Sequence, residues 1–208
     1  MRTLFIVRHG QTEWNVAGRM QGRMDSPLTG QGKSQARANG LLLQRLGGMQ
    51  VVWCSPAGRT RQTAALLNTE LKAPVNFADA LQERDCGLWS GLTLDEIATR
   101  FPQDWDQRQR DPFWHQPPSG ENMPDMQARC AGFLDEILQH DWCAAALVTH
   151  GVLSKVILMH YLGLSEQQAV ALKHPNELVY RLSFTDDEIQ PDYFIHGGAA
   201  CSGLLWPD

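Results

Sequence analysis

Cysteine is scarce in this chain and is not spaced to support structure or bind metal. The 208 residues contain five cysteines, an odd and widely spaced set without a Cys-x-x-Cys pair. This spacing fits neither a disulfide framework nor a cysteine-based zinc site, so we expect reduced thiols. The five are Cys54, Cys86, Cys130, Cys143 and Cys201.

Long apolar runs and basic clusters are also missing. No stretch approaches the length of a membrane-spanning helix, and no charged leader precedes the first apolar run, so we expect a cytoplasmic protein without membrane contact. The net charge is -5, and lysine and arginine form no long cluster, which argues against nucleic-acid binding. No grouping of carboxylates or histidines indicates a metal site, and we expect no cofactor.

The composition is that of an ordinary globular protein. Hydrophobic residues make up 43% of the chain and charged residues 20%. A chain of 208 residues can bury one substantial core. We therefore predict a single domain over residues 1–208 with an insertion at about 88–120, and we leave open whether the chain forms a homo-oligomer.

Strand-like and helix-like segments alternate along the sequence. This alternation predicts a three-layer α/β/α fold in which helices cover both faces of a mostly parallel central sheet. Continuously apolar runs predict buried strands at 4–7, 51–54 and 144–149. Helical periodicity predicts helices at 32–46, 57–71, 121–140 and 152–162. Segments 178–184 and 189–195 are expected to pair antiparallel at an edge.

The segment from about 88 to 120 is rich in aromatic residues and contains a Pro117-Pro118 break. We interpret it as an insertion of helices and loops over the carboxyl edge of the sheet. Its aromatic side chains, with two from an earlier loop, could line a substrate pocket. They could instead form a small core of their own, which we favour for most of them. The side chains concerned are Trp14, Met20, Trp89, Phe113, Trp114 and His115.

Two His-Gly pairs follow apolar runs that lie far apart in the sequence. Arg8, His9 and Gly10 follow the first predicted strand, and His150 follows the strand at 144–149. Open α/β sheets bind ligands at the carboxyl ends of their strands, so we expect both imidazoles to face one cleft. A histidine that attacks phosphorus must be uncharged, and nearby arginines favour that form by lowering its pKa.

Two further side chains fit phosphoryl transfer. Arg59 lies in the first turn of a predicted helix, which is unfavourable for a cation unless an anion binds between the arginine and the helix end. Arg61, two residues further on, would face elsewhere. Glu83 could protonate a leaving oxygen, although an isolated glutamate is more often a surface carboxylate.

A series of motifs extends over nearly the whole chain in a fixed order. Taken together, these motifs resemble the histidine phosphatase superfamily, with its phosphoglycerate mutase-like fold, and in particular its small phosphatase branch. The matching segments are 7–15, 18–22, 25–30, 55–64, the turn around Glu83, 118–122 and 148–151.

The resemblance implies a role for each candidate residue. His9 would carry the phosphoryl group, and Glu83 would act as the proton donor. The phosphoryl oxygens would be bound by Arg8, Arg59 and by His150, which would add positive charge if protonated. Asn15 and Gln21 match residues that contact the phosphate or the substrate in family members. No metal is needed for this chemistry.

The implied function is a metal-independent phosphomonoesterase that removes phosphate from a small phosphorylated metabolite. A cofactor-dependent phosphoglycerate mutase is the first alternative. In such mutases a tyrosine and a lysine that recognise phosphoglycerate follow the catalytic Glu-Arg, whereas Cys86 and Leu94 stand here. We therefore favour the phosphatase. A non-catalytic protein that binds phosphorylated ligands or proteins is the second alternative, and the presence of all five core residues argues against it.

Overall fold

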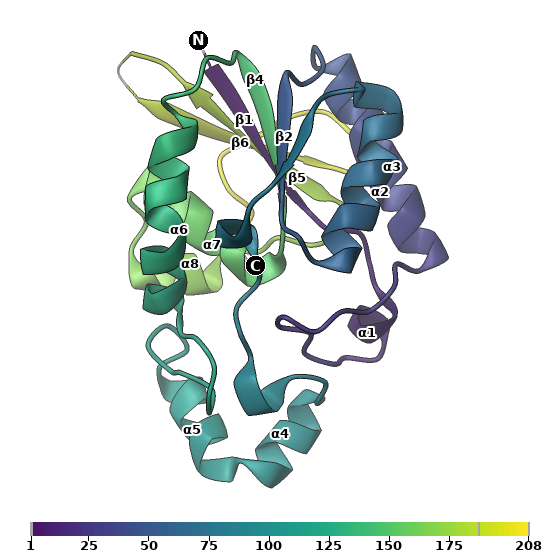
Figure 1. The fold of residues 1–208 in the computed structure, drawn as a ribbon. Coiled ribbons are helices and arrows are strands. Elements are labelled where there is room, and N and C mark those ends of the chain that lie inside the picture. The colour runs from purple at the N-terminus through teal and green to yellow at the C-terminus, as the bar shows by residue number, and fades with distance from the viewer. Residues whose placement is uncertain (1, 187, 208) are drawn as a thin grey trace.

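The computed structural model describes residues 2–186 and 188–207, and within them seven strands form one sheet in the order β3-β2-β4-β1-β5-β6-β7 (Figure 1). The first four in the chain are parallel to one another and comprise β1 (Arg2–Arg8), β2 (Val51–Cys54), β3 (Val75–Phe77) and β4 (Ala144–Thr149). An antiparallel edge is formed by β5 (Leu178–Phe184), β6 (Ile189–Ile195) and β7 (Cys201–Ser202). The predicted α/β fold with a mostly parallel core is confirmed.

Helices cover both faces of the sheet, as Figure 1 shows. On one face lie α2 (Gly30–Arg45) and α3 (Gly58–Leu71). On the other lie α6 (Met123–Ile137), α7 (Gly151–Leu162) and α8 (Glu166–Ala171). The apolar run of β1 serves both layers: Leu4 and Ile6 pack with α6 and α7, whereas Phe5 and Val7 pack with α2 and α3. A strand buried on two faces needs this uninterrupted apolar run.

The insertion has a small core of its own beyond the carboxyl ends of the parallel strands. It contains α4 (Leu94–Arg100) and α5 (Pro102–Arg110), which lie apart from the main layers in Figure 1. Trp89 is completely buried with Ile97, and the ring of His115 stacks on Trp89 at 5.0 Å. Phe113 instead joins the main core, and Trp114 is 53% exposed.

Several short elements were not predicted, and some boundaries differ. A short helix α1 (Glu13–Val16) follows the N-cap residue Thr12, whose side chain forms a capping box with Asn15. Helix α6 begins at Met123 rather than at residue 121, because the Asn122 side chain accepts a hydrogen bond from Asp125 N–H and sets the helix start there. The unpredicted β3, β7 and α8 have too few residues for a clear periodic signal.

The close packing of α2 on α3 depends on Gly40. A Cβ atom placed on Gly40 would lie 2.8 Å from the carbonyl oxygen of Leu67, so the two helix backbones approach where no side chain fits. We expect Gly40→Ala to lower the free energy of unfolding by about 1–3 kcal/mol, measured by urea denaturation. Gly132→Ala is the matched control, because a Cβ on Gly132 in α6 meets no atom within 4 Å. It should raise stability by about 0.5–1 kcal/mol, and equal effects at the two positions would contradict the packing argument.

Candidate active site

The pairing of β1 with β4 brings the two His-Gly segments together. Arg8 lies opposite Thr149 in this parallel pair, and the N–H of His9 donates to the carbonyl oxygen of Thr149 at 2.9 Å. The next residue on each strand is therefore a histidine at the same level. The His9 and His150 rings lie with centroids 5.4 Å apart and planes inclined by 63°. The two imidazoles meet at the carboxyl edge of the sheet, as the sequence predicts.

The backbone around His9 determines which ring nitrogen is free. Its Nδ1 lies 2.8 Å from the carbonyl oxygen of Gly10, and a carbonyl can only accept, so Nδ1 carries the proton. The Nε2 lone pair is then available to attack an electrophile. Burial lowers the pKa of His9 well below its usual value, and the charges of Arg8 and Arg59 lower it further. His9 is therefore a neutral imidazole near pH 7, the form a nucleophile needs.

His150 caps the N-terminus of α7 and is completely buried. Its Nε2 lies 2.8 Å from the hydroxyl oxygen of Ser55 at the end of β2. Burial lowers the pKa of His150 well below its usual value, with further contributions from the charges of Arg59, His9 and Arg8. From the sequence, a positive charge on His150 is expected only if the ring is protonated, and the lowered pKa favours the neutral ring, which can contribute hydrogen bonding.

Arg59 is 1% exposed and is held by loop carbonyls. Its guanidinium donates to the carbonyl oxygens of Met24 at 2.7 Å and Gly22 at 2.8 Å, and to Asp25 Oδ1 at 3.1 Å. The same Asp25 oxygen accepts the backbone N–H of Arg59 at 3.0 Å. The anion at this helix N-terminus is therefore a carboxylate of the protein, where we expected the substrate.

Arg8 ends β1, and its side chain turns toward the start of α7. One terminal nitrogen donates to the carbonyl oxygen of His174 at 2.8 Å. The guanidinium lies so close to Gly151 that a Cβ on this glycine would be 3.2 Å from the Arg8 Cζ. The glycine that follows His150 therefore makes room for the arginine that precedes His9.

Glu83 reaches across to the N-terminus of α7. Its Oε2 accepts the N–H of Val152 at 3.1 Å, and its Oε1 accepts the N–H groups of Leu153 at 3.1 Å and Arg84 at 2.9 Å. The free N–H groups and the dipole at a helix N-terminus favour a negative side chain there. The carboxylate is thus fixed beside the two histidines although its backbone belongs to a loop.

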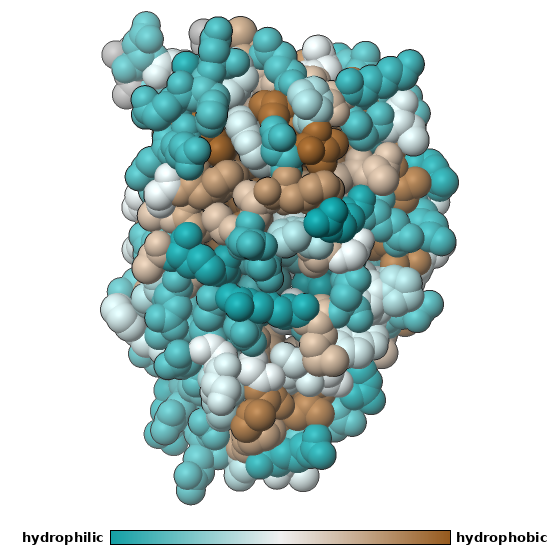
Figure 2. Space-filling model, viewed as in Figure 1, coloured by the Kyte–Doolittle hydropathy of each residue, from teal (hydrophilic) through white to brown (hydrophobic). Residues whose placement is uncertain are grey.

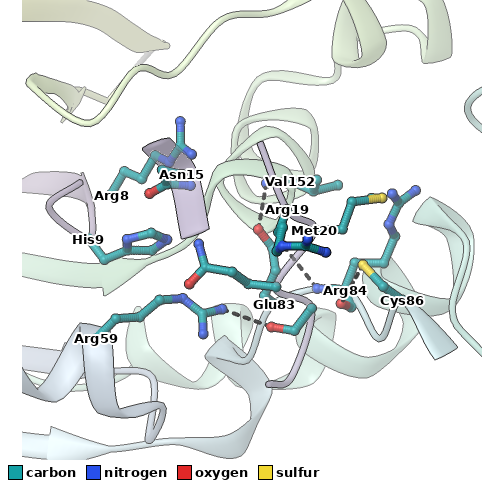
Figure 3. A pocket seen from close by; sticks show the side chains of 12 residues that line it. Arg8, His9, Asn15, Arg19, Met20, Arg59, Glu83, Arg84, Cys86 and Val152 are labelled. Carbon is teal, nitrogen blue, oxygen red and sulfur yellow. Dashed lines mark hydrogen bonds between the residues drawn. The ribbon is translucent and has the colours of Figure 1, made fainter. Parts of the chain in front are cut away.

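These side chains border one pocket with a cavity volume of about 140 Å³, whose residues Figure 3 draws as sticks. Figure 2 shows hydrophilic side chains gathered across the middle of this face, between the sheet and the insertion. The predicted residues on the pocket wall are Arg8, His9, Asn15, Gln21, Arg59 and Glu83. His150 is not among the residues that line this pocket, so the expectation that both imidazoles face one cleft holds only for His9. Met20, one of the proposed pocket-wall side chains, also borders the cavity.

Several buried polar atoms around this pocket have no hydrogen-bond partner among the described residues. On the pocket wall they are Arg8 Nε, Arg59 Nε, Arg84 Nε and Gln21 Oε1, and His150 Nδ1 nearby is a further such atom. Buried polar groups are normally satisfied, so unpaired donors on three arginines indicate a site for a polar, acceptor-rich ligand. The Oδ1 of Asn15 accepts the N–H of Thr12 at 3.0 Å, which orients this side chain on the wall.

Some residues that hold the site were missed by the sequence analysis. The Asn176 side chain donates to the His9 carbonyl oxygen at 2.7 Å, and Thr63 Oγ1 accepts the N–H of Gly10 at 3.1 Å. Thr63 could have been found, since it lies one helical turn after Arg59. Asn176 precedes β5 and has no sequence pattern that links it to residue 9.

Comparison with known proteins identifies the family. The model of the histidine phosphatase superfamily (branch 1) matches residues 4–194. The chain belongs to the histidine phosphatase superfamily. A relative in this superfamily, phosphoserine phosphatase 1 of Hydrogenobacter thermophilus, is 32% identical over 166 residues, which cover 78% of this chain and 77% of the relative.

Superfamily relatives carry different activity names. The 2,3-bisphosphoglycerate-dependent phosphoglycerate mutase of Methylobacterium radiotolerans is 34% identical, covering 88% of this chain and 90% of its own. The structure of a mycobacterial glucosyl-3-phosphoglycerate phosphatase matches with a TM-score of 0.82 and 28% identity over 96% of this chain and all of that one. The chain also matches the 6-phosphofructo-2-kinase/fructose-2,6-bisphosphatase of Caenorhabditis elegans. The match covers 34% of that protein's length, about a third.

Two structural features bear on cofactors and membranes. Among residues 2–186 and 188–207, no three His, Cys, Asp or Glu side chains gather in a way that could hold a metal ion. Over the same residues, no helix combines the length and the apolar character needed to cross a membrane. Metal independence remains a prediction to be tested by assay.

The buried histidines of this superfamily member should make its stability depend on pH. Burial lowers the pKa of His9 and His150 well below 6.5 and that of His174 to about 3, whereas in the unfolded chain all three protonate near 6.5. Below pH 6.5 the unfolded state therefore binds more protons. The free energy of unfolding should decrease as the pH is lowered below 6.5, by up to about 1.4 kcal/mol per pH unit for each imidazole. Above pH 6.5 these groups should make it independent of pH.

Urea denaturation between pH 5 and 7.5 measures this dependence. In His174→Asn the slope below pH 6.5 should decrease by one proton relative to the unsubstituted protein, because the replaced side chain does not titrate. An unchanged slope in that variant would show that His174 is protonated in the folded state.

Proposed function

We propose that the chain is a phosphomonoesterase that acts through a phosphohistidine at His9. The hydrogen bond from His9 Nδ1 to the Gly10 carbonyl oxygen carries the proposal, because it leaves the opposite nitrogen unprotonated beside two arginines. In Figure 3 the His9 ring projects toward the interior of the pocket, with Arg8 and Arg59 on either side. A neutral nucleophile next to fixed positive charge suits attack on a phosphate ester.

In the first step, His9 Nε2 attacks phosphorus, an N–P bond forms and the ester P–O bond breaks. The proton of Glu83, taken up with the substrate, passes to the departing oxygen, so the product leaves as an alcohol. Arg8 and Arg59 stabilise the charge on the three equatorial oxygens through nitrogen atoms that have no protein partner. His150 adds a hydrogen bond from its Nδ1 side.

In the second step, water replaces the alcohol. Glu83, now ionised, accepts a proton from the water as its oxygen bonds to phosphorus and the N–P bond breaks. Inorganic phosphate leaves, and His9 returns to its neutral state with Nδ1 still protonated. The three backbone N–H groups that hold Glu83 keep its carboxylate at the same place for both proton transfers.

The substrate we propose is a small phosphorylated metabolite. The pocket volume of about 140 Å³ fits the phosphoryl group and the atoms next to it, and the rest of the substrate would extend toward Met20 and the insertion. Relatives named as phosphoserine phosphatase and glucosyl-3-phosphoglycerate phosphatase support this substrate class and the hydrolytic reaction.

The nucleophile assignment can be tested with p-nitrophenyl phosphate. We expect hydrolysis that persists in EDTA and falls at least about 1,000-fold in His9→Ala, because the covalent route is then lost. Release of nitrophenol and phosphate is the measurement, with His115→Gln as a control outside the pocket. Loss of activity in EDTA would contradict the metal-independent mechanism, and acid-stable labelling of another residue by substrate would contradict the role of His9.

A mutase is the second candidate, favoured by the 34% identity to a phosphoglycerate mutase. Cys86 and Leu94 argue against it, since they occupy the positions of the mutases' tyrosine and lysine. We expect 3-phosphoglycerate, with or without its bisphosphate cofactor, to yield inorganic phosphate and no 2-phosphoglycerate. Isomerisation without phosphate release, followed by NMR, would establish the mutase instead.

A further inference from the structure

The segment 118–121 packs on the turn that carries Glu83, although no step of the proposed reaction uses it. The N–H of Leu88 donates to the Pro118 carbonyl oxygen at 3.0 Å, and the N–H of Glu121 donates to the Asp85 carbonyl oxygen at 2.8 Å. A Cβ on Gly87 would lie 2.1 Å from the Pro118 oxygen, so the two backbones touch directly. The sequence motif at 118–122 therefore builds a support for the Glu83 turn.

An ion pair between Glu121 and Arg129 attaches to this turn on both sides of Glu83. Arg129 Nε donates to Glu121 Oε1 at 2.9 Å. Before Glu83 in the sequence, the guanidinium donates to the carbonyl oxygens of Ala80 at 2.9 Å and Gln82 at 3.0 Å. After Glu83, Glu121 Oε2 accepts the N–H of Asp85 at 3.0 Å. The residues before and after Glu83 are thus both bonded to the Glu121–Arg129 ion pair, and Arg23 forms a second ion pair with Glu121 at 3.0 Å.

The ion pair is well shielded from solvent. The side chains of Glu121 and Arg129 are 16% and 21% exposed. Burial alone would raise the pKa of Glu121, but hydrogen bonds from Arg129 and Asp85 N–H, together with the charges of Arg129 and Arg23, hold it below its usual value. A shielded pair with several charge-assisted hydrogen bonds restricts motion more than an exposed one does.

We propose that the Glu121–Arg129 ion pair is a positioning element that sets where Glu83 delivers its proton. This inference rests on the proposed function of Glu83 as proton donor. Glu83 bridges two bodies, because its carboxylate is anchored to the N-terminus of α7 while its backbone is attached through Arg129 to α6. Small displacements of a proton donor cost much of its effect, so the attachment to α6 determines catalysis without touching substrate.

The leaving group provides a readout that a purely structural role would not move. Protonation matters greatly for an alkoxide leaving group and little for p-nitrophenolate, which is stable as an anion. The probe is the ratio of kcat/KM for β-glycerol phosphate to that for p-nitrophenyl phosphate. Because both values scale with the amount of folded enzyme, the ratio is independent of partial unfolding.

We expect Arg129→Met to lower this ratio roughly 10-fold, a part of the ~10²–10⁴-fold that a proton donor supplies. Arg129→Lys and Glu121→Gln keep some of the hydrogen bonds and should recover part of the ratio. Arg181→Met is the matched control, because Arg181 forms a similarly shielded ion pair with Asp192 between β5 and β6. Its ratio should equal that of the unsubstituted protein.

Glu83→Gln separates this inference from the proposed function. If Glu83→Gln lowers the ratio strongly and Arg129→Met leaves it unchanged, the positioning role is wrong and the proton donor stands. If Glu83→Gln also leaves the ratio unchanged, Glu83 is not the proton donor. A reduced ratio in Arg181→Met would mean that loss of any such ion pair disturbs the site, which would overturn the specific role of Arg129.

Discussion

The parallel pairing of β1 with β4 is the interaction on which the site depends. Because Arg8 lies opposite Thr149, the residue that follows each strand is a histidine. The strand register alone therefore brings the His9 and His150 rings close together. A shift by one residue would turn each apolar side chain of β1 to the other face of the sheet, and both cores would lose their packing. The same burial that fixes the register therefore also fixes the distance between His9 and His150.

Burial of so many basic groups at one sheet edge has electrostatic consequences. The guanidinium of Arg59 donates hydrogen bonds to Asp25 and to backbone carbonyl oxygens, while that of Arg8 donates to the His174 carbonyl oxygen. These protein acceptors hold both guanidinium groups inside the site, but the Nε atoms of Arg8 and Arg59 have no hydrogen-bond partner among residues 2–186 and 188–207. Burial and the charges of the two arginines lower the pKa of both histidines, which favours their neutral form. In the proposed reaction, a dianionic phosphoryl group would accept hydrogen bonds from these nitrogen atoms.

The sequence predicted the site residues that lie at strand ends or helix starts. It did not predict residues whose place in the site depends on tertiary contacts. His9, His150 and Arg59 could be placed because each follows an apolar run or begins a helix, and the sheet then determines where these ends meet. Asn176 carries no such signal, since its contact with residue 9 exists only after the chain has folded, whereas Ser55 follows the apolar run 51–54 and could have been placed at the same sheet edge. The helix N-terminus at Arg59 shows a related limit: the sequence predicted an anion there but not that Asp25 would supply it.

The proposed chemistry and the proposed recognition of the leaving group belong to different parts of the molecule. Both histidines, Arg8 and Arg59 lie at strand ends or at the starts of helices. Met20 and Cys86, which border the pocket, pack with the small core around Trp89, and this core is separate from the two main cores. In the proposed reaction Glu83 serves both parts, because it gives its proton to an atom of the leaving group. The Glu121–Arg129 ion pair attaches the Glu83 turn to α6. We infer that this attachment keeps the proposed proton donor in a fixed position relative to the sheet when the sequence of the insertion changes. The same catalytic site can then act on different substrates.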